Sequence, residues 1–168
     1  MRYRLDVVAP SVTEAVMFAG GWLFDRVMAG WDVTVLVDED ADDRPLQILG
    51  VEALDLEIGL ASWAHRPRPQ SLAVATDLFD RDSRVRLGVL KALDHGATEV
   101  TLWGNKWPAE LDNTVDSVQH RLSAAARAFK AQALAAAALR DVAVEPTETF
   151  RSGSSTRLSV AADLTPAS

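Results

Sequence analysis

The chain has 168 residues, of which 48% are hydrophobic and 24% charged, which excludes a chain disordered throughout and suits a single domain. It has no cysteine, which excludes disulfides, thiolate zinc sites and cysteine nucleophiles, and no apolar run of about 18 residues that could span a membrane. The net charge of −7 argues against a nucleic-acid partner, and the first residues lack a signal-peptide core, so we expect a cytoplasmic protein.

The first 37 residues predict a strand, a helix and a second strand. Residues 4–9 and 32–37 are apolar runs, and strands that are apolar on both faces are typical of a parallel sheet covered by helices on both sides. Between them, large apolar residues recur at helical spacing from Val16 to Trp31, and Gly30 marks the expected helix end. These residues therefore predict a right-handed βαβ unit.

The middle of the chain continues the alternation of helices and strands. We expect a short helix at 44–49, a half-exposed strand at 54–60 and a loop at 63–69, whereas residues 71–79 suit a strand or a helix. A further helix should end at His95, with Gly96 as the left-handed residue after it. Residues 98–103 predict the next strand, and 105–113 a polar loop.

The last third predicts the longest helix of the chain, from Val115 to Ala136, on apolar spacing and high alanine content. The helix should place His120 on the surface. Residues 147–150 suggest a last strand, and the expected fold is an α/β, Rossmann-like three-layer sandwich with a mostly parallel sheet. We expect one domain at residues 1–151 and a flexible or weakly held tail at 152–168, with one more strand around 158–160.

Short motifs along most of the chain point to a known family. The first match runs without a gap through Ala9, Pro10, Gly20, Gly21, Leu23, Gly30, Val33, Thr34 and Val35. Weaker matches follow at 49–51 (LGV), 129–134 (FKAQAL) and 148–150 (ETF). The chain thus resembles the PIG-L/LmbE-type zinc deacetylases, which open with an apolar strand followed by Ala-Pro-His-Pro-Asp-Asp-Glu. The resemblance implies a Rossmann-like fold and hydrolysis of N-acetylglucosaminyl compounds.

The chain departs from that family at the residues that carry the reaction. In the family, the His and the second Asp of the motif bind zinc, the first Asp is the general base, and a later His completes the site. By position, Ser11 stands at the ligand His, Thr13 at the base Asp and Glu14 at the ligand Asp. A serine hydroxyl stays protonated near neutral pH, and a threonine cannot accept a proton from water as a carboxylate does. The resemblance therefore implies the scaffold without the metal motif.

The same turn also has a purely structural interpretation. Ser11-x-x-Glu14 before an apolar helix is a capping box, in which Ser11 accepts from the amide of Glu14 and Glu14 reaches back. The free amides at such a helix start could also bind an anion without a metal.

Other candidate sites have a structural alternative as well. The acidic loop 38–43, which begins at Asp38, could hold a hard cation or simply be solvated. His65, Arg66 and Arg68 form a basic spot that could bind a phosphate or carboxylate, or be a solvated loop. Trp103, Asn105 and Trp107 could line a sugar site or pack in the core.

We therefore expect a catalytically inactive deacetylase-like protein that binds a protein partner, a second copy of itself or a small polar ligand such as a sugar. The predicted ligand-binding residues are Ser11, Thr13, Glu14, Asp38, Trp103 and Asn105, with no catalytic residue, no metal and no cofactor. Exposed Trp22, Trp31 or Trp63 would suit an interface. Two alternatives stay open: a deacetylase that rebuilds a zinc site from Glu14, the acidic loop and a histidine, and a purely structural subunit.

Overall fold

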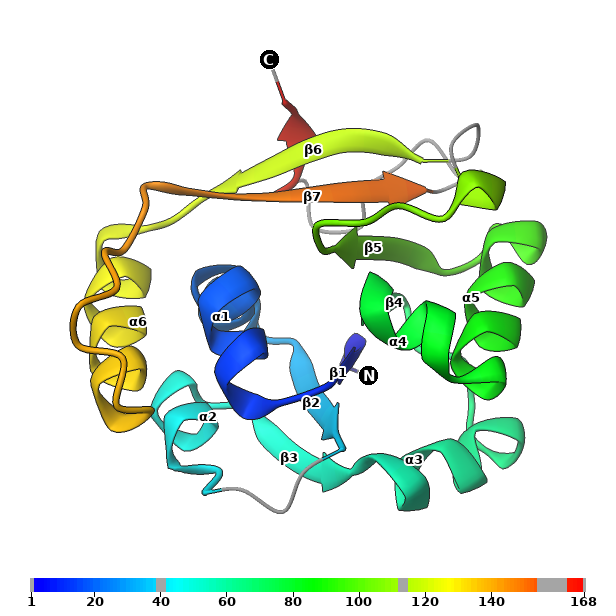
Figure 1. The fold of residues 1–168 in the computed structure, drawn as a ribbon, viewed down its shortest axis with the longest axis horizontal. Coiled ribbons are helices and arrows are strands. Elements are labelled where there is room, and N and C mark those ends of the chain that lie inside the picture. The colour runs from blue at the N-terminus through cyan, green and yellow to red at the C-terminus, as the bar shows by residue number, and fades with distance from the viewer. Residues whose placement is uncertain (1, 39–41, 112–114, 154–162, 168) are drawn as a thin grey trace.

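The computed structural model describes residues 2–38, 42–111, 115–153 and 163–167. These residues form an eight-stranded sheet in the order β3-β2-β1-β4-β5-β7-β6-β8 (Figure 1). The strands are β1 (Arg4–Ala9), β2 (Asp32–Val37), β3 (Glu52–Asp55), β4 (Ser71–Ala75), β5 (Glu99–Trp103), β6 (Asp116–Arg121), β7 (Thr147–Gly153) and β8 (Thr165–Pro166).

The sheet is mixed, which corrects the expectation of a mostly parallel one. Strands β3, β2, β1, β4 and β5 are parallel neighbours, but β7 is antiparallel to β5, and β6 is antiparallel to both β7 and β8. The difference arises at residues 116–121, where the apolar spacing predicts a helix and the structure has a strand. The α/β class is confirmed, and the arrangement is compatible with a Rossmann-like fold.

Helices cover both faces of the sheet (Figure 1). The helices are α1 (Val12–Met28), α2 (Arg44–Leu49), α3 (Leu56–Ser62), α4 (Thr76–Arg81), α5 (Ser83–His95) and α6 (Ala124–Ala136), with short 3₁₀ turns η1 (Trp63–His65) and η2 (Ala109–Leu111). Helices α1, α2 and α6 pack together on one face, and α3, α4 and α5 lie on the other.

Alternate side chains of β1 enter two separate cores. Leu5, Val7 and Ala9 pack under α1, whereas Val8 packs with the residues under α5. Since both faces are buried, an apolar residue is favoured at nearly every position, which explains the unbroken apolar run. Asp6 is the exception, because it is buried on the α5 face.

The strand expected at 54–60 is wrong. Strand β3 ends at Asp55, and α3 begins at Leu56. The Asp55 carboxylate accepts hydrogen bonds from the amides of Glu57 and Ile58, which is an N-cap. Leu54 and Leu56 alternate with Asp55 and Glu57 in either structure, so the alternation does not reveal the cap. Residues 71–79, ambiguous in sequence, form β4 and then α4.

The single helix expected at 115–136 is also wrong. Residues 116–121 form β6, and α6 begins after Ser123, whose hydroxyl accepts from the amide of Ala126. His120 is therefore buried in the sheet instead of on the surface, with its Nε2 2.7 Å from a carboxylate oxygen of Asp25. Among the described helices, α1 is the longest, with 17 residues.

Two further expectations concern tryptophans and the tail. Trp22 and Trp31 are buried in the core under α1 and thus cannot form an interface, whereas Trp63 is partly exposed.

The strand expected around 158–160 lies outside the described residues, and the weakly held tail stays a prediction. Within the described residues, no helix has the length and apolar character needed to cross a membrane.

Two adjacent glycines in α1 meet different surroundings, which gives a matched pair of variants. A Cβ at Gly21 would overlap the side chain of Leu122, whereas a Cβ at Gly20 would make ordinary contacts at 3.5 Å. We expect Gly21→Ala to lower the free energy of unfolding by about 1–3 kcal/mol through overpacking. Gly20→Ala should raise it by up to about 1 kcal/mol through helix propensity. Urea unfolding of both variants checks this; equal effects would contradict the close packing of Leu122 onto Gly21.

Candidate functional site

The turn from β1 into α1 lies at the carboxyl edge of the sheet and holds three predicted site residues. The Ser11 hydroxyl accepts from the amide of Glu14 at 3.0 Å, which confirms the N-cap. The reciprocal half of the capping box is absent from the hydrogen bonds of the described residues. Instead, the Glu14 carboxylate accepts from the indole Nε1 of Trp103 at 3.3 Å.

Trp103 is the last residue of β5, and this position places its indole next to Glu14. Trp103 is buried, and Gly104 follows with a φ of +147°, in the region that favours glycine. A Cβ at Gly104 would overlap the hydroxyl of Thr76, at the start of α4. The glycine therefore lets the chain after β5 pass close to α4, and the indole reaches across to α1.

Burial of Glu14 raises the pKa of its carboxyl group. The Trp103 hydrogen bond opposes this shift, the charge of Asp77 adds to it, and the charge of Arg81 opposes it. The structure thus brings together groups that follow β1, β4 and β5. A partly buried carboxyl with a raised pKa is a feature of many functional sites, although structural carboxyls have it too.

A raised Glu14 pKa predicts a pH-dependent effect of Glu14→Gln. The folded state holds the proton more tightly than the unfolded state, so wild-type stability should fall as pH rises above the ordinary value near 4.5. Glu14→Gln keeps an acceptor for Trp103 but cannot ionise, so its stability relative to wild type should increase between about pH 4 and about pH 7. Urea midpoints over this range measure the difference.

Glu57 provides the control of opposite sign. Hydrogen bonds from Arg84 lower the pKa of the exposed Glu57 carboxyl, so Glu57→Gln should lose stability relative to wild type as pH rises. A Glu14→Gln difference that is independent of pH would contradict the raised pKa.

The other three predicted residues are not joined to this group. Thr13 is partly buried in the first turn of α1, Asp38 is exposed after β2, and Asn105 is exposed after Gly104. Within the described part of the chain, none of the three forms a hydrogen bond with Ser11, Glu14 or Trp103. Residues 39–41 of the acidic loop lie outside the described residues, and the predicted ligand contacts remain predictions.

The side chains at this turn do not fit the zinc site that the resemblance implies. Zinc hydrolases use about three nitrogen, sulfur or carboxylate ligands plus a water. Here the Ser11 hydroxyl caps a helix, Thr13 offers a second hydroxyl, and Glu14 supplies one carboxylate, which accepts from an indole. Across residues 2–38, 42–111, 115–153 and 163–167, no three His, Asp or Glu side chains are grouped as a metal site would need.

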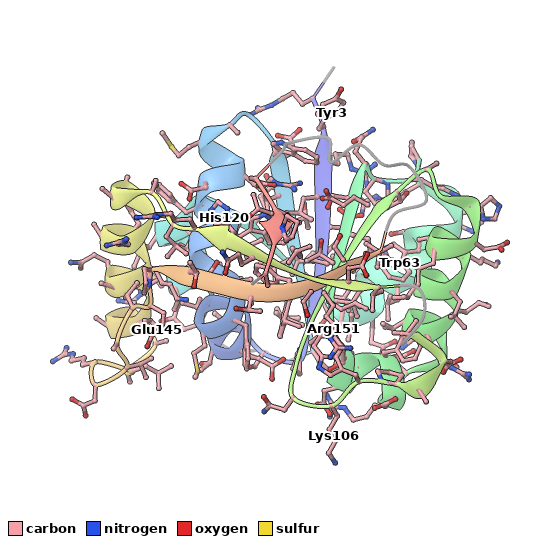
Figure 2. The ribbon with its side chains drawn as sticks, turned by 90° about the horizontal axis from the view of Figure 1, so that it is seen from above. Tyr3, Trp63, Lys106, His120, Glu145 and Arg151 are labelled. Carbon is pink, nitrogen blue, oxygen red and sulfur yellow. The ribbon has the colours of Figure 1, made fainter. Side chains whose placement is uncertain are left out.

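A cavity of about 660 Å³ is lined by Gly104, which follows Trp103, but by none of Ser11, Thr13, Glu14 and Trp103. Its walls come from α1, the loop after β5, α6, the segment 142–147 and β7; they include Met17, Phe18, Gly104, Trp107, Lys130 and Arg151. The Arg151 guanidinium lies 4.3 Å from the centre of the Trp107 ring. In Figure 2, Arg151 and Lys106 lie toward the edge opposite Tyr3, which precedes β1.

A buried ion pair forms one wall of the cavity. Glu148 accepts from Lys130 Nζ at 2.7 Å and from the amides of Gly21 and Trp22 at 2.8 and 2.7 Å. Lys130 Nζ also donates to the carbonyl of Met17 at 2.8 Å. Both side chains are nearly inaccessible, at 5% and 3% exposure. Burial raises the pKa of Glu148, and Lys130 and the two amides oppose that shift.

Sequence reasoning missed Lys130, Glu148 and Arg151 as neighbours of the candidate site. In the sequence, the segments 129–134 and 148–150 stand out only as matches to a family, together with Gly20 and Gly21. In the fold, these three separate matches meet at the middle of α1. The joint occurrence of these matches was the signal in the sequence that could have indicated that Lys130 and Glu148 lie together against α1.

The chain matches no protein-family model and no curated protein. Solved structures do share its fold. A deacetylase of teicoplanin biosynthesis in complex with teicoplanin aligns with a TM-score of 0.66 at 13% identity, covering 92% of this chain and 100% of that one. The A40926 pseudoaglycone deacetylase Dbv21 aligns with a TM-score of 0.62 at 16% identity, covering 90% and 97%.

A third likeness is to the conserved protein TT1542 from Thermus thermophilus, with a TM-score of 0.50 at 16% identity, covering 87% of this chain and 92% of that one. At such identities the likenesses establish the fold alone: the chain shares the α/β fold of these deacetylases. This supports the resemblance found in the sequence at the level of fold and leaves the loss of the metal motif untested.

Proposed function

We propose that this chain uses a deacetylase-like fold to bind a small polar ligand and does not catalyse zinc-dependent deacetylation. The observation that carries the proposal is the donor set at the β1–α1 turn. Ser11 and Thr13 replace the family's zinc ligand and general base by position, and the remaining carboxylate of Glu14 bonds to Trp103. With two hydroxyls and one carboxylate, the turn lacks a full set of zinc ligands, and Thr13 offers no carboxylate at the position of the family's general base.

The cavity at the loop after β5 supports a binding role. Its volume of about 660 Å³ is in the range of small-molecule sites. Trp107 contributes an aromatic ring to the lining, of the kind against which sugars stack, and the Arg151 guanidinium lies 4.3 Å from the centre of that ring. The solved neighbours are named as a deacetylase of teicoplanin biosynthesis and an A40926 pseudoaglycone deacetylase. Because the resemblance in the sequence implies N-acetylglucosaminyl compounds, an N-acetylated sugar is the first ligand class to test.

Three measurements on the purified full chain test the proposal. Metal analysis should find less than stoichiometric zinc, and incubation with N-acetylglucosaminyl compounds should release no acetate above the buffer control. An NMR titration with N-acetylglucosamine should shift the signals of Gly104 and the Trp107 indole. Trp107→Ala should abolish the shift of the Gly104 signal, while Trp63→Ala, which lies outside this cavity, should leave the shifts of Gly104 and Trp107 unchanged.

An active metal-dependent deacetylase is the alternative, and one observation favours it. Glu14 has a raised pKa and lies close enough to Asp77 to sense its charge, so two carboxyl groups lie near each other at the carboxyl edge. Stoichiometric zinc that is lost in Glu14→Ala, together with acetate release, would establish this alternative and overturn the proposal.

Association with a protein partner or a second copy of the chain is the remaining expectation. Met17 and Val142 line the same cavity and are both exposed apolar side chains. Size-exclusion chromatography with light scattering measures self-association. A dimer that is lost in Met17→Glu would assign this edge to an interface in place of a small-ligand site.

A further inference from the structure

A second cavity, of about 430 Å³, lies far from the candidate site just described. It is built at the amino ends of β1 and β4, between the sheet and α3 and α5; Arg4, Asp6 and Leu72 come from those strands. Its wall is apolar where Leu60, Leu87 and Ala92 line it. Figure 2 places Trp63 on the α5 side of the sheet, away from Glu145 on the α6 side.

Trp63 forms part of this wall because of a glycine. A Cβ at Gly88, in the middle of α5, would collide with the six-membered ring of Trp63. Gly88 therefore allows the indole to pack closely against α5, and both residues line the cavity.

Five cations surround the opening, in a chain whose net charge is −7. They are Arg4, Arg66, Arg68, Arg84 and Lys91. Arg84 is already paired with Glu57 and Asp82, and Arg4 with Asp6. Across the described residues, Arg66, Arg68 and Lys91 form no salt bridge with a carboxylate. Like charges gathered in this way repel one another, and a bound anion would relieve the repulsion.

Asp6 supplies a second, independent indication of a ligand. Its side chain is 2% exposed and lines the cavity. One carboxylate oxygen accepts from Arg4 Nη2 at 3.1 Å, but the other, Oδ1, is buried and has no hydrogen-bond partner among the described residues. A buried acceptor left unpaired is costly and rare. Burial also raises the pKa of Asp6, and the charges of Arg4 and Arg66 oppose this.

We infer that this cavity binds a small phosphorylated, hydroxyl-bearing molecule of the sugar-phosphate class. Arg66, Arg68 and Lys91 hold the phosphate at the opening, because guanidinium and ammonium groups form charge-assisted hydrogen bonds with phosphate oxygens. Asp6 Oδ1 has almost no accessible surface in this structure, so in the bound state the carboxylate turns toward the cavity and accepts from a hydroxyl of the ligand. The C–H face of the sugar packs against Trp63 and the apolar wall. The cavity volume lies within the range of small-molecule sites.

This inference extends the meaning of the basic spot seen in the sequence. Arg66 and Arg68 of that spot line the cavity, whereas His65 is exposed and does not. The inference is independent of the proposed function, since the two cavities share no residue.

An NMR titration of the full chain with glucose 6-phosphate, ribose 5-phosphate, inorganic phosphate and glucose tests the inference. Glucose 6-phosphate should shift the Trp63 indole and the Gly88 amide, leave Gly104 and Trp107 unchanged, and bind more tightly than inorganic phosphate or glucose. The double variant Arg66→Ala/Arg68→Ala should weaken binding of glucose 6-phosphate about tenfold or more, as loss of charged hydrogen bonds implies. Arg86→Ala, an exposed arginine of α5 outside the cavity, should change it less than about twofold.

Asp6→Asn separates the hydroxyl contact from the phosphate contact. Asp6→Asn should weaken the binding of glucose 6-phosphate, because it removes a carboxylate oxygen that accepts from the sugar. It should leave the binding of inorganic phosphate unchanged or make it tighter, because it also removes a negative charge. The inference is overturned if glucose 6-phosphate and ribose 5-phosphate both fail to shift Trp63 and Gly88. It is equally overturned if Arg86→Ala weakens binding as much as the double variant does, since only general surface charge would then be involved.

Discussion

Glu148→Ala is expected to lower the free energy of unfolding by about 3–5 kcal/mol, the cost of breaking a buried ion pair from one side. The substitution leaves the Lys130 ammonium buried without its counter-charge. It also removes the acceptor of the Gly21 and Trp22 amides in the middle of α1. Urea unfolding followed by circular dichroism measures the loss.

A double variant distinguishes the uncompensated charge from lost packing. Lys130→Met with Glu148→Gln removes both charges while keeping similar volumes and one acceptor oxygen for α1, so it should cost less than Glu148→Ala. A Glu148→Ala loss below about 1 kcal/mol would contradict the role assigned to this pair.

Arg26→Ala should also lower the free energy of unfolding by about 3–5 kcal/mol, because it too breaks a buried ion pair from one side. Arg26 is fully buried, donates to Glu99 at 2.9 Å and makes two hydrogen bonds to Asp163 at 2.6 and 2.8 Å. Its guanidinium lies 4.8 and 4.3 Å from the ring centres of Trp22 and Trp31. Burial lowers the pKa of Arg26, but the Asp163 and Glu99 contacts outweigh it and the pKa is raised. Urea unfolding measures the loss.

Three variants control this experiment. Arg26→Lys keeps the charge but not the planar group that stacks between the two rings, so its loss should be intermediate. Asp163→Ala should cost less than Arg26→Ala, because Asp163 is partly exposed and Glu99 retains Arg26. Arg127→Ala, an exposed arginine on α6, should change stability by no more than about 0.5 kcal/mol. Equal losses for Arg26→Ala and Arg127→Ala would refute the argument.

The parallel half of the fold could be predicted because its signals are local. Residues 4–9 and 32–37 form the expected strands, 44–49 the expected helix, and Gly96 the expected left-handed residue, with a φ of +69°. The antiparallel half could not, because Val118, His120 and Leu122 fit strand spacing while Val115, Val118 and Leu122 fit helix spacing. Pairing between β6 and β7 decided between the two patterns, and that pairing joins residues distant in sequence.

The candidate site was predictable only in part. The Ser11 cap is a local signal and is confirmed. The approach of Trp103 to Glu14 depends on the order of β1, β4 and β5 in the sheet and on the conformation of Gly104, neither of which the sequence displays. The cavity wall from β7 was hidden for the same reason, because β7 inserts beside β5 from far along the chain.

The surviving family matches have a structural explanation. Gly20, Gly21, Lys130 and Glu148 form one buried cluster that joins α1, α6 and β7. Such a cluster stabilises the fold whatever side chains stand at the β1–α1 turn.

The buried polar groups of α1 find their hydrogen-bond partners late in the chain, which has a consequence for protein synthesis. This helix ends at Met28, yet Lys130, Glu148 and Asp163, more than a hundred residues later in the chain, supply the partners of its buried polar groups. On the ribosome, α1 must therefore wait for more than a hundred further residues before it can settle into its final packing. A nascent chain arrested before β7 should remain a substrate for chaperones and proteases.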